Sequence, residues 1–174
     1  SKKHIEAIKK IDNTAQIFAL RSGLSNNHVQ GVINLDESDL QNCSVDFAVI
    51  SNPTHLHEKF IIKLSEKKIP ILIEKPPIHS LKNAKKILTQ IKKGGVFSYV
   101  AFNMRYHPCI IFLKKYLDNN SKKINEVNIY SGSYLPSWRP GTDYKKSYSS
   151  NLDMGGGVHL DLIHELDYCL HLFD

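Results

Sequence analysis

Short apolar runs alternate with amphipathic segments along residues 15–102 of the 174-residue chain. The runs lack polar alternation, as expected of strands that helices cover on both faces. They lie at residues 15–20, 45–50, 69–73 and 96–102. The pattern predicts strand-helix-strand units around a parallel sheet, which is a Rossmann-type α/β fold.

The segments between the runs carry apolar side chains at helical spacing. One stripe covers residues 56–64, and a second covers residues 81–91, with Ser80 as its expected N-cap and Gly94 and Gly95 at its end. Another helix is expected near the start of the chain, from Ile5, Ile8 and Ile11. Because a nucleotide-binding sheet opens with a strand and a glycine-rich turn, we expect the chain to begin just after them.

The pattern changes after residue 102, where we expect a domain boundary. Residues 1–102 are predicted to form an N-terminally truncated nucleotide-binding domain, and residues 103–174 the start of a second, also truncated, domain. Within the second part the expected elements are a helix at 107–117, a strand at 126–131, a long irregular loop at 134–153 and one helix at 158–173. A loop of this length is usually functional or disordered, and its aromatic residues favour function.

Composition excludes several classes of protein. A hydrophobic content of 41% argues against disorder, and the sequence contains no apolar run long enough for a membrane span or a signal peptide. The net charge of +6 comes from scattered lysines without a nucleic-acid recognition motif. Cys43, Cys109 and Cys169 stand among apolar neighbours, which predicts buried thiols in a reducing compartment. The simplest interpretation is a cytoplasmic protein that binds neither membrane nor nucleic acid.

Polar clusters follow each apolar run, at the strand ends where open α/β sheets bind ligands. Turns are polar in any case, so a single cluster carries little information. The residues concerned are Arg21, Ser22, Ser51, Asn52, Pro53, Glu74, Lys75, Asn103 and Arg105. Together they predict one polar rim.

Lys75 lies between Glu74 and two prolines and is well placed for proton exchange with a substrate oxygen. Its alternative role is a surface salt bridge with Glu74. Asp161 and His164 are three residues apart, so one helix face would carry a carboxylate beside an imidazole. Their alternative role is a helix-surface ion pair.

Candidate substrate contacts are Arg105 and, in the long loop, Trp138, Arg139 and Tyr144. His55 and His57 alone give a weak zinc signal, so no metal site is predicted.

The chain resembles the Gfo/Idh/MocA family, which includes glucose-fructose oxidoreductase and inositol dehydrogenases. The resemblance covers almost the whole chain, through residues 1–5, 45–57 (VDFAVISNPTHLH), 71–76 (ILIEKP), 101–108 (AFNMRYHP) and 155–167 (GGGVHLDLIHELD). It implies a dinucleotide-binding domain followed by an α/β domain with a large, mainly antiparallel sheet that forms homo-oligomer contacts.

The resemblance also implies site residues. Lys75, Asp161 and His164 match the catalytic group, although inositol dehydrogenases separate the aspartate and histidine by four positions, so which residue is the general base stays open. Ser51, Asn52, Pro53, His57, Glu74, Lys75 and Asn103, with Arg21 and Ser22, are expected along the cofactor. An arginine after the second strand accommodates a 2′-phosphate, so NADP is favoured over NAD.

The function expected from this resemblance is hydride transfer between NAD(P) and a secondary alcohol of a sugar, polyol or nucleotide-sugar. Two alternatives remain open. One is an NAD-dependent glycosidase of the same family, and the other is a non-catalytic dinucleotide sensor, since fold alone does not fix function.

Overall fold

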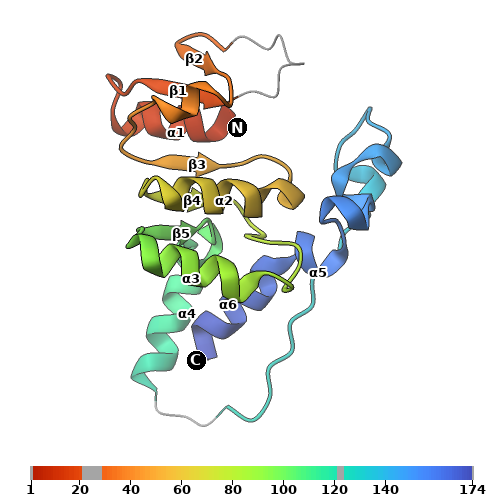
Figure 1. The fold of residues 1–174 in the computed structure, drawn as a ribbon. Helices are drawn as coiled ribbons and strands as arrows, with labels where there is room; N and C mark the ends of the chain where they lie inside the picture. Colours follow the sequence, from red (N-terminus) through yellow and green to blue (C-terminus); the bar gives the residue numbers. More distant parts are fainter. Residues whose placement is uncertain (1, 21–28, 121–123, 174) are drawn as a thin grey trace. The chain divides into compact units, whose positions relative to one another are not determined.

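A computed structural model of the chain describes residues 2–20, 29–120 and 124–173 (Figure 1). The chain forms two compact units, Ser1–Asp46 and Phe47–Asp174. The first unit contains helix α1 (Lys2–Ile11) and the parallel strands β1 (Ile17–Leu20) and β2 (Val32–Leu35). The helix and β1 confirm the sequence pattern, whereas β2 was missed because it is a four-residue run that contains an asparagine.

The second unit is built on a three-stranded parallel sheet. Its strands are β3 (Ala48–Ile50), β4 (Ile71–Ile73) and β5 (Ser98–Val100), in the order β3-β4-β5. The core of this sheet is apolar, and Ile50, Ile71 and Ile73 are each at most 4% exposed. The predicted α/β fold with parallel strands is therefore confirmed.

Helices α2 (His57–Glu66) and α3 (Ala84–Gly94) pack against each other, and α2 also contacts β3 and β4 (Figure 1). Helix α3 ends at Gly95, whose φ of 61° is left-handed, as predicted. Its predicted start was wrong. Ser80 accepts a hydrogen bond from the Lys82 amide within a turn that precedes the helix, and Leu81 is 84% exposed rather than part of the buried face.

Two predictions for the region after residue 102 need correction. Helix α4 (Pro108–Asn119) forms as expected, but the described part of residues 126–131 is not a strand, because no described segment pairs with it. The loop at 134–153 is more regular than expected. It contains 3-10 turns at Leu135–Ser137, Tyr144–Lys146, Tyr148–Ser150 and Leu152–Met154.

The predicted C-terminal helix is interrupted. It consists of α5 (Val158–Asp161) and α6 (Ile163–Phe173), with Leu162 between them at φ −100° and ψ 30°. Asp161 therefore ends one helix and His164 lies in the first turn of the next. The prediction that both share a face of one continuous helix was wrong.

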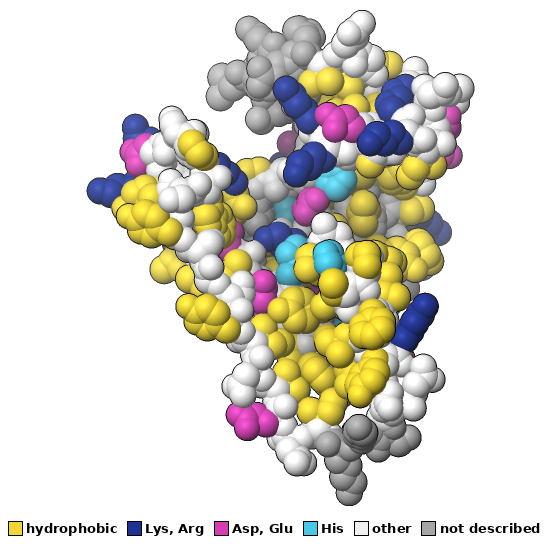
Figure 2. All heavy atoms as spheres, turned by 180° about the vertical axis from the view of Figure 1, so that it is seen from behind, with side chains coloured by type: hydrophobic (Ala, Val, Ile, Leu, Met, Phe, Trp, Pro, Cys, Tyr) yellow, Lys and Arg dark blue, Asp and Glu magenta, His cyan; other side chains and the backbone are white. Residues whose placement is uncertain are grey.

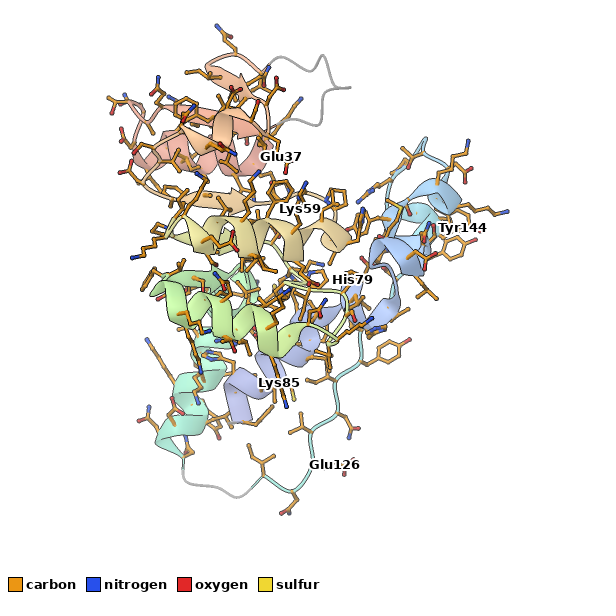
Figure 3. The ribbon with its side chains drawn as sticks, in the orientation of Figure 1. Glu37, Lys59, His79, Lys85, Glu126 and Tyr144 are labelled. Carbon is orange, nitrogen blue, oxygen red and sulfur yellow. The ribbon has the colours of Figure 1, made fainter. Side chains whose placement is uncertain are left out.

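Two of the three glycines before α5, Gly155 and Gly156, fit closely against the rest of the unit. A Cβ atom on Gly155 would lie 2.9 Å from Cβ of His79, which Figure 3 labels on the loop before α3. A Cβ atom on Gly156 would lie 2.2 Å from the Tyr148 carbonyl oxygen and 2.7 Å from that of Ser149. The absence of side chains at these two glycines therefore lets the end of the long loop and the loop before α3 lie close to the start of α5.

The cysteines are more exposed than the sequence predicted, and several large apolar side chains lie on the surface. Cys109 is exposed on α4 and Cys169 is only half-buried, as is Cys43 in the first unit, so the prediction of buried thiols was wrong. Large apolar side chains are also exposed on α4 and α6, at Phe112, Tyr116, Leu166 and Leu170. Figure 2 shows one face on which hydrophobic side chains gather. No helix in the described part of the chain has the length and apolarity to cross a bilayer.

We expect Gly156→Ala to lower the free energy of unfolding by about 1–3 kcal/mol, because the new methyl group must displace backbone oxygens. Gly132→Ala is the matched control, since its nearest neighbour would be the Tyr130 hydroxyl at 3.9 Å. Its effect should stay within about 0.5 kcal/mol. Urea denaturation of the two variants in the whole protein measures both, and equal midpoints would contradict the close packing at Gly156.

Candidate active site

The carboxyl ends of β3, β4 and β5 meet at one edge of the sheet. The Glu74 amide donates to the Ile50 carbonyl at 2.9 Å, and the Ala101 amide donates to the Ile73 carbonyl at 2.8 Å. The loops that follow all begin at this edge. Three of the four predicted polar clusters are thus brought together, while the cluster of Arg21 and Ser22 lies outside the described residues.

Lys75 is directed from this edge toward α5. Its ammonium Nζ donates to the main-chain carbonyl of Asp161 at 2.6 Å, and its backbone amide donates to the Glu74 carboxylate at 3.2 Å. In these two bonds the Lys75 ammonium contacts Asp161, whereas Glu74 contacts the Lys75 backbone, so neither bond is a salt bridge between the Lys75 and Glu74 side chains. An ammonium group has three N–H donors, so a substrate oxygen could accept a further hydrogen bond.

Asp161 is 9% exposed, and its carboxylate accepts a hydrogen bond from the Ser149 hydroxyl at 3.2 Å. Among the described residues no hydrogen bond joins this carboxylate to His164. The expected orientation of the imidazole by Asp161 is therefore absent from this arrangement, because the break at Leu162 separates the two residues. Ser149 was not identified from the sequence, where it is one of several serines in a polar loop.

His164 packs its ring edge-to-face with Phe102, at 6.1 Å between centroids. Its Nδ1 is buried and has no hydrogen-bond partner in the described part of the chain. Burial lowers the pKa of His164, and the nearby Lys75 charge lowers it further. The ring is consequently neutral near pH 7, the state in which an imidazole can accept a proton.

His57 is buried between two main-chain carbonyls, and its expected place along a cofactor stays a prediction. It is 1% exposed, with Nδ1 3.0 Å from the Pro76 carbonyl and Nε2 2.9 Å from the Asn52 carbonyl. The ring thus ties the loop after β3 to the turn that carries Lys75. Sequence reasoning missed this link, because the Pro76 carbonyl lies 19 positions from His57 along the chain.

Arg105 forms an ion pair with Asp167, and its expected contact with a substrate stays a prediction. Its guanidinium donates to both carboxylate oxygens of Asp167, at 2.8 and 2.6 Å. These hydrogen bonds raise the pKa of Arg105 above its ordinary value. Asp167 is 7% exposed and lies three positions after His164 on α6, so it adds a second buried carboxylate to the group of Asp161 and His164.

The loop candidates Trp138, Arg139 and Tyr144 make contacts within their own segment. The Trp138 indole donates to the Ser133 hydroxyl, and the Arg139 guanidinium lies 5.3 Å from the centre of the Tyr148 ring. Figure 3 shows Tyr144 on the far side of this segment from His79. Their role in substrate contact stays a prediction.

Two further polar atoms near the strand ends, Oδ1 of Asn52 and Nδ1 of His55, are buried without a hydrogen-bond partner in the described chain. Buried polar atoms in folded proteins normally have partners, so these positions suit a ligand with hydroxyl or amide groups. Within the described residues, His, Cys, Asp and Glu side chains do not gather in threes as a metal site requires.

Comparison with known proteins bears on this site. A family profile described as "Oxidoreductase family, NAD-binding Rossmann fold" matches residues 1–102. The scyllo-inositol 2-dehydrogenase (NAD(+)) of Bacillus subtilis is 28% identical over 134 residues, which cover 76% of this chain and 36% of that protein. The levoglucosan dehydrogenase of Pseudarthrobacter phenanthrenivorans is 27% identical over 125 residues, or 72% and 30% of the two chains. The chain thus spans about a third of the length of these relatives.

Solved structures show the same fold. The WlbA dehydrogenase of Thermus thermophilus, in complex with NAD and UDP-GlcNAcA, superposes with a TM-score of 0.75 at 21% identity. The match covers 99% of this chain and 59% of that one. At this identity the likeness establishes the fold alone.

We expect the pKa of His164 to lie below 6.5 and to rise in Lys75→Met, because that change removes a nearby positive charge. Ring NMR titration measures this, with the His164 signal assigned by its loss in His164→Gln. A pKa unaffected by Lys75→Met would show that the two groups do not interact.

Proposed function

Because the chain belongs to the Gfo/Idh/MocA family of NAD-binding oxidoreductases, we propose that the whole protein transfers a hydride between a nicotinamide dinucleotide and a secondary alcohol. The substrate class is a sugar, polyol or nucleotide-sugar. The single observation that carries this proposal is the Lys75 ammonium at the carboxyl edge of the parallel sheet, bonded to the Asp161 carbonyl at 2.6 Å. It lies near enough to His164 to lower the pKa of that imidazole. A proton acceptor and a cation next to a nucleotide-binding edge suit alcohol oxidation.

The residues of the second unit fit a nicotinamide nucleotide. The buried Oδ1 of Asn52 is an acceptor that a ribose hydroxyl or a carboxamide would satisfy. Pro53, Glu74 and Asn103 lie on loops that leave the same sheet edge. When bound, the cofactor supplies the hydride acceptor or donor.

The chain's own residues then divide the work on the substrate hydroxyl. The neutral ring of His164 accepts the hydroxyl proton, and the Lys75 ammonium stabilises the negative charge that develops on the substrate oxygen. Asp161 holds Lys75 through its main-chain carbonyl rather than orienting His164. In the reverse direction the same imidazole returns the proton.

We expect Lys75→Ala to reduce turnover at least about 100-fold while leaving cofactor affinity unchanged, because one ammonium in an oxyanion-stabilising position is worth that much. Lys86→Ala, on the exposed face of α3, is the matched control and should turn over normally. Absorbance at the wavelength of the reduced nicotinamide measures turnover, and fluorescence titration measures cofactor binding. Normal turnover in Lys75→Ala would remove Lys75 from the mechanism. Sugar release without net cofactor reduction would instead favour the glycosidase.

We also propose that the whole protein prefers NADP, because residue 21, after the second strand expected of the nucleotide-binding sheet, is an arginine, which can accommodate a 2′-phosphate. Arg21→Ala should weaken NADPH binding about 10- to 100-fold, since a lost charged hydrogen bond has that effect, and leave NADH binding nearly unchanged. Paired calorimetric titrations with the two cofactors decide this. Tighter binding of NADH to the unaltered protein would assign NAD.

A further inference from the structure

We propose that Ser149 is a positioning residue of the active site, acting through Asp161 on the amine of Lys75. The inference rests on the proposed function, which it deepens by adding a residue outside the catalytic group. Its starting point is a connected pair of hydrogen bonds. The Ser149 hydroxyl donates to the Asp161 carboxylate at 3.2 Å, and the carbonyl of the same aspartate accepts from Lys75 Nζ at 2.6 Å.

Both partners of the first bond are buried, with exposures of 7% for Ser149 and 9% for Asp161. A carboxylate shielded from water requires donors from the protein, because burying it unpaired is costly. Among the described residues the Ser149 hydroxyl is the side-chain donor that the structure gives it. The position of the Asp161 side chain therefore depends on Ser149.

The helix that carries Asp161 cannot fix this residue by itself. Helix α5 has four residues, and Asp161 is the last, bonded through its amide to the Gly157 carbonyl at 2.9 Å. A single helical turn is marginal without tertiary contacts. The chain changes direction at Leu162 directly afterwards. The hydrogen bond from Ser149 to the Asp161 side chain therefore helps to fix the position of the Asp161 carbonyl, which accepts the hydrogen bond from Lys75.

Ser149 is itself held firmly against α5. The absence of a side chain at Gly156 allows the 3-10 turn Tyr148–Ser150 to approach, and the Gly156 amide donates to the Asn151 carbonyl at 2.9 Å. On the other side of the turn, Arg139 lies over the Tyr148 ring. Ser149 therefore joins the loop predicted to contact substrate to the residue that holds the catalytic amine.

Three variants of the whole protein test the proposal. Ser149→Ala should lower kcat about 10- to 100-fold with the KM for cofactor unchanged, because it removes a hydrogen bond to a charged group. Ser149→Thr keeps the hydroxyl and should recover most of the activity. Ser150→Ala is the control and should leave kcat unchanged. Among the described residues, the exposed Ser150 hydroxyl lies within hydrogen-bond distance of carbonyls of its own loop, at Tyr144, Lys145 and Ser147.

A second measurement does not depend on activity. Acetic anhydride labelling, read by mass spectrometry, should modify Lys75 several times faster in Ser149→Ala than in the unaltered protein, with Lys86 as the internal reference. A structural role in the loop alone would change Ser149→Ala and Ser150→Ala alike. Should Ser149→Ala not fold, Ser149→Cys, a weak donor of similar volume, replaces it.

The outcomes separate the two proposals. Loss of kcat and faster Lys75 labelling in Ser149→Ala, both reversed by Ser149→Thr, support the positioning role. Equal kcat and equal labelling in the Ser149 and Ser150 variants overturn it. If the unaltered protein shows no dehydrogenase turnover, the proposed function fails, and the labelling rates still decide whether Ser149 positions Lys75.

Discussion

The hydrogen bond from Lys75 to the Asp161 carbonyl joins two parts of the second unit that lie 86 positions apart in the sequence. One end is a turn at the edge of the parallel sheet, and the other is the last residue of a one-turn helix. Because the lysine side chain is long and flexible, such a fixed partner is what gives its charge a defined place. The geometry of the candidate site follows from how firmly each end is held.

The sheet end is held by His57. Its two ring nitrogens face carbonyls of Pro76 and Asn52, so the ring links the turn with Lys75 to the loop with Asn52. The helix end is held by the Ser149 hydroxyl and by the close approach that Gly156 allows. Neither His57 nor Ser149 needs to touch a substrate to influence the reaction.

Electrostatics gives His164 its chemical character. Burial and the nearby charge of Lys75 lower the pKa of His164, while Glu165, Asp167 and Glu74 act in the opposite sense. Arg105 binds the Asp167 carboxylate with two hydrogen bonds. Burial and Lys75 are the two largest influences on the pKa of the imidazole. The resulting neutral ring beside an ammonium group is a suitable pair for alcohol chemistry.

The sequence by itself determined the parallel sheet, the helices at α1, α2 and α4, and the residue types at the strand ends, because apolar periodicity and turn composition are local properties. It also identified Lys75, Asp161 and His164 as the group of interest, through motif order. It could not determine the break at Leu162, the pairing of Arg105 with Asp167, or the roles of His57 and Ser149. Each of these depends on a partner elsewhere in the chain or on a backbone turn that sequence spacing does not encode. A strand was likewise expected at residues 126–131, but a strand exists only where another one bonds to it. Tertiary structure decided these points because hydrogen bonds and burial are set by which segments meet in space.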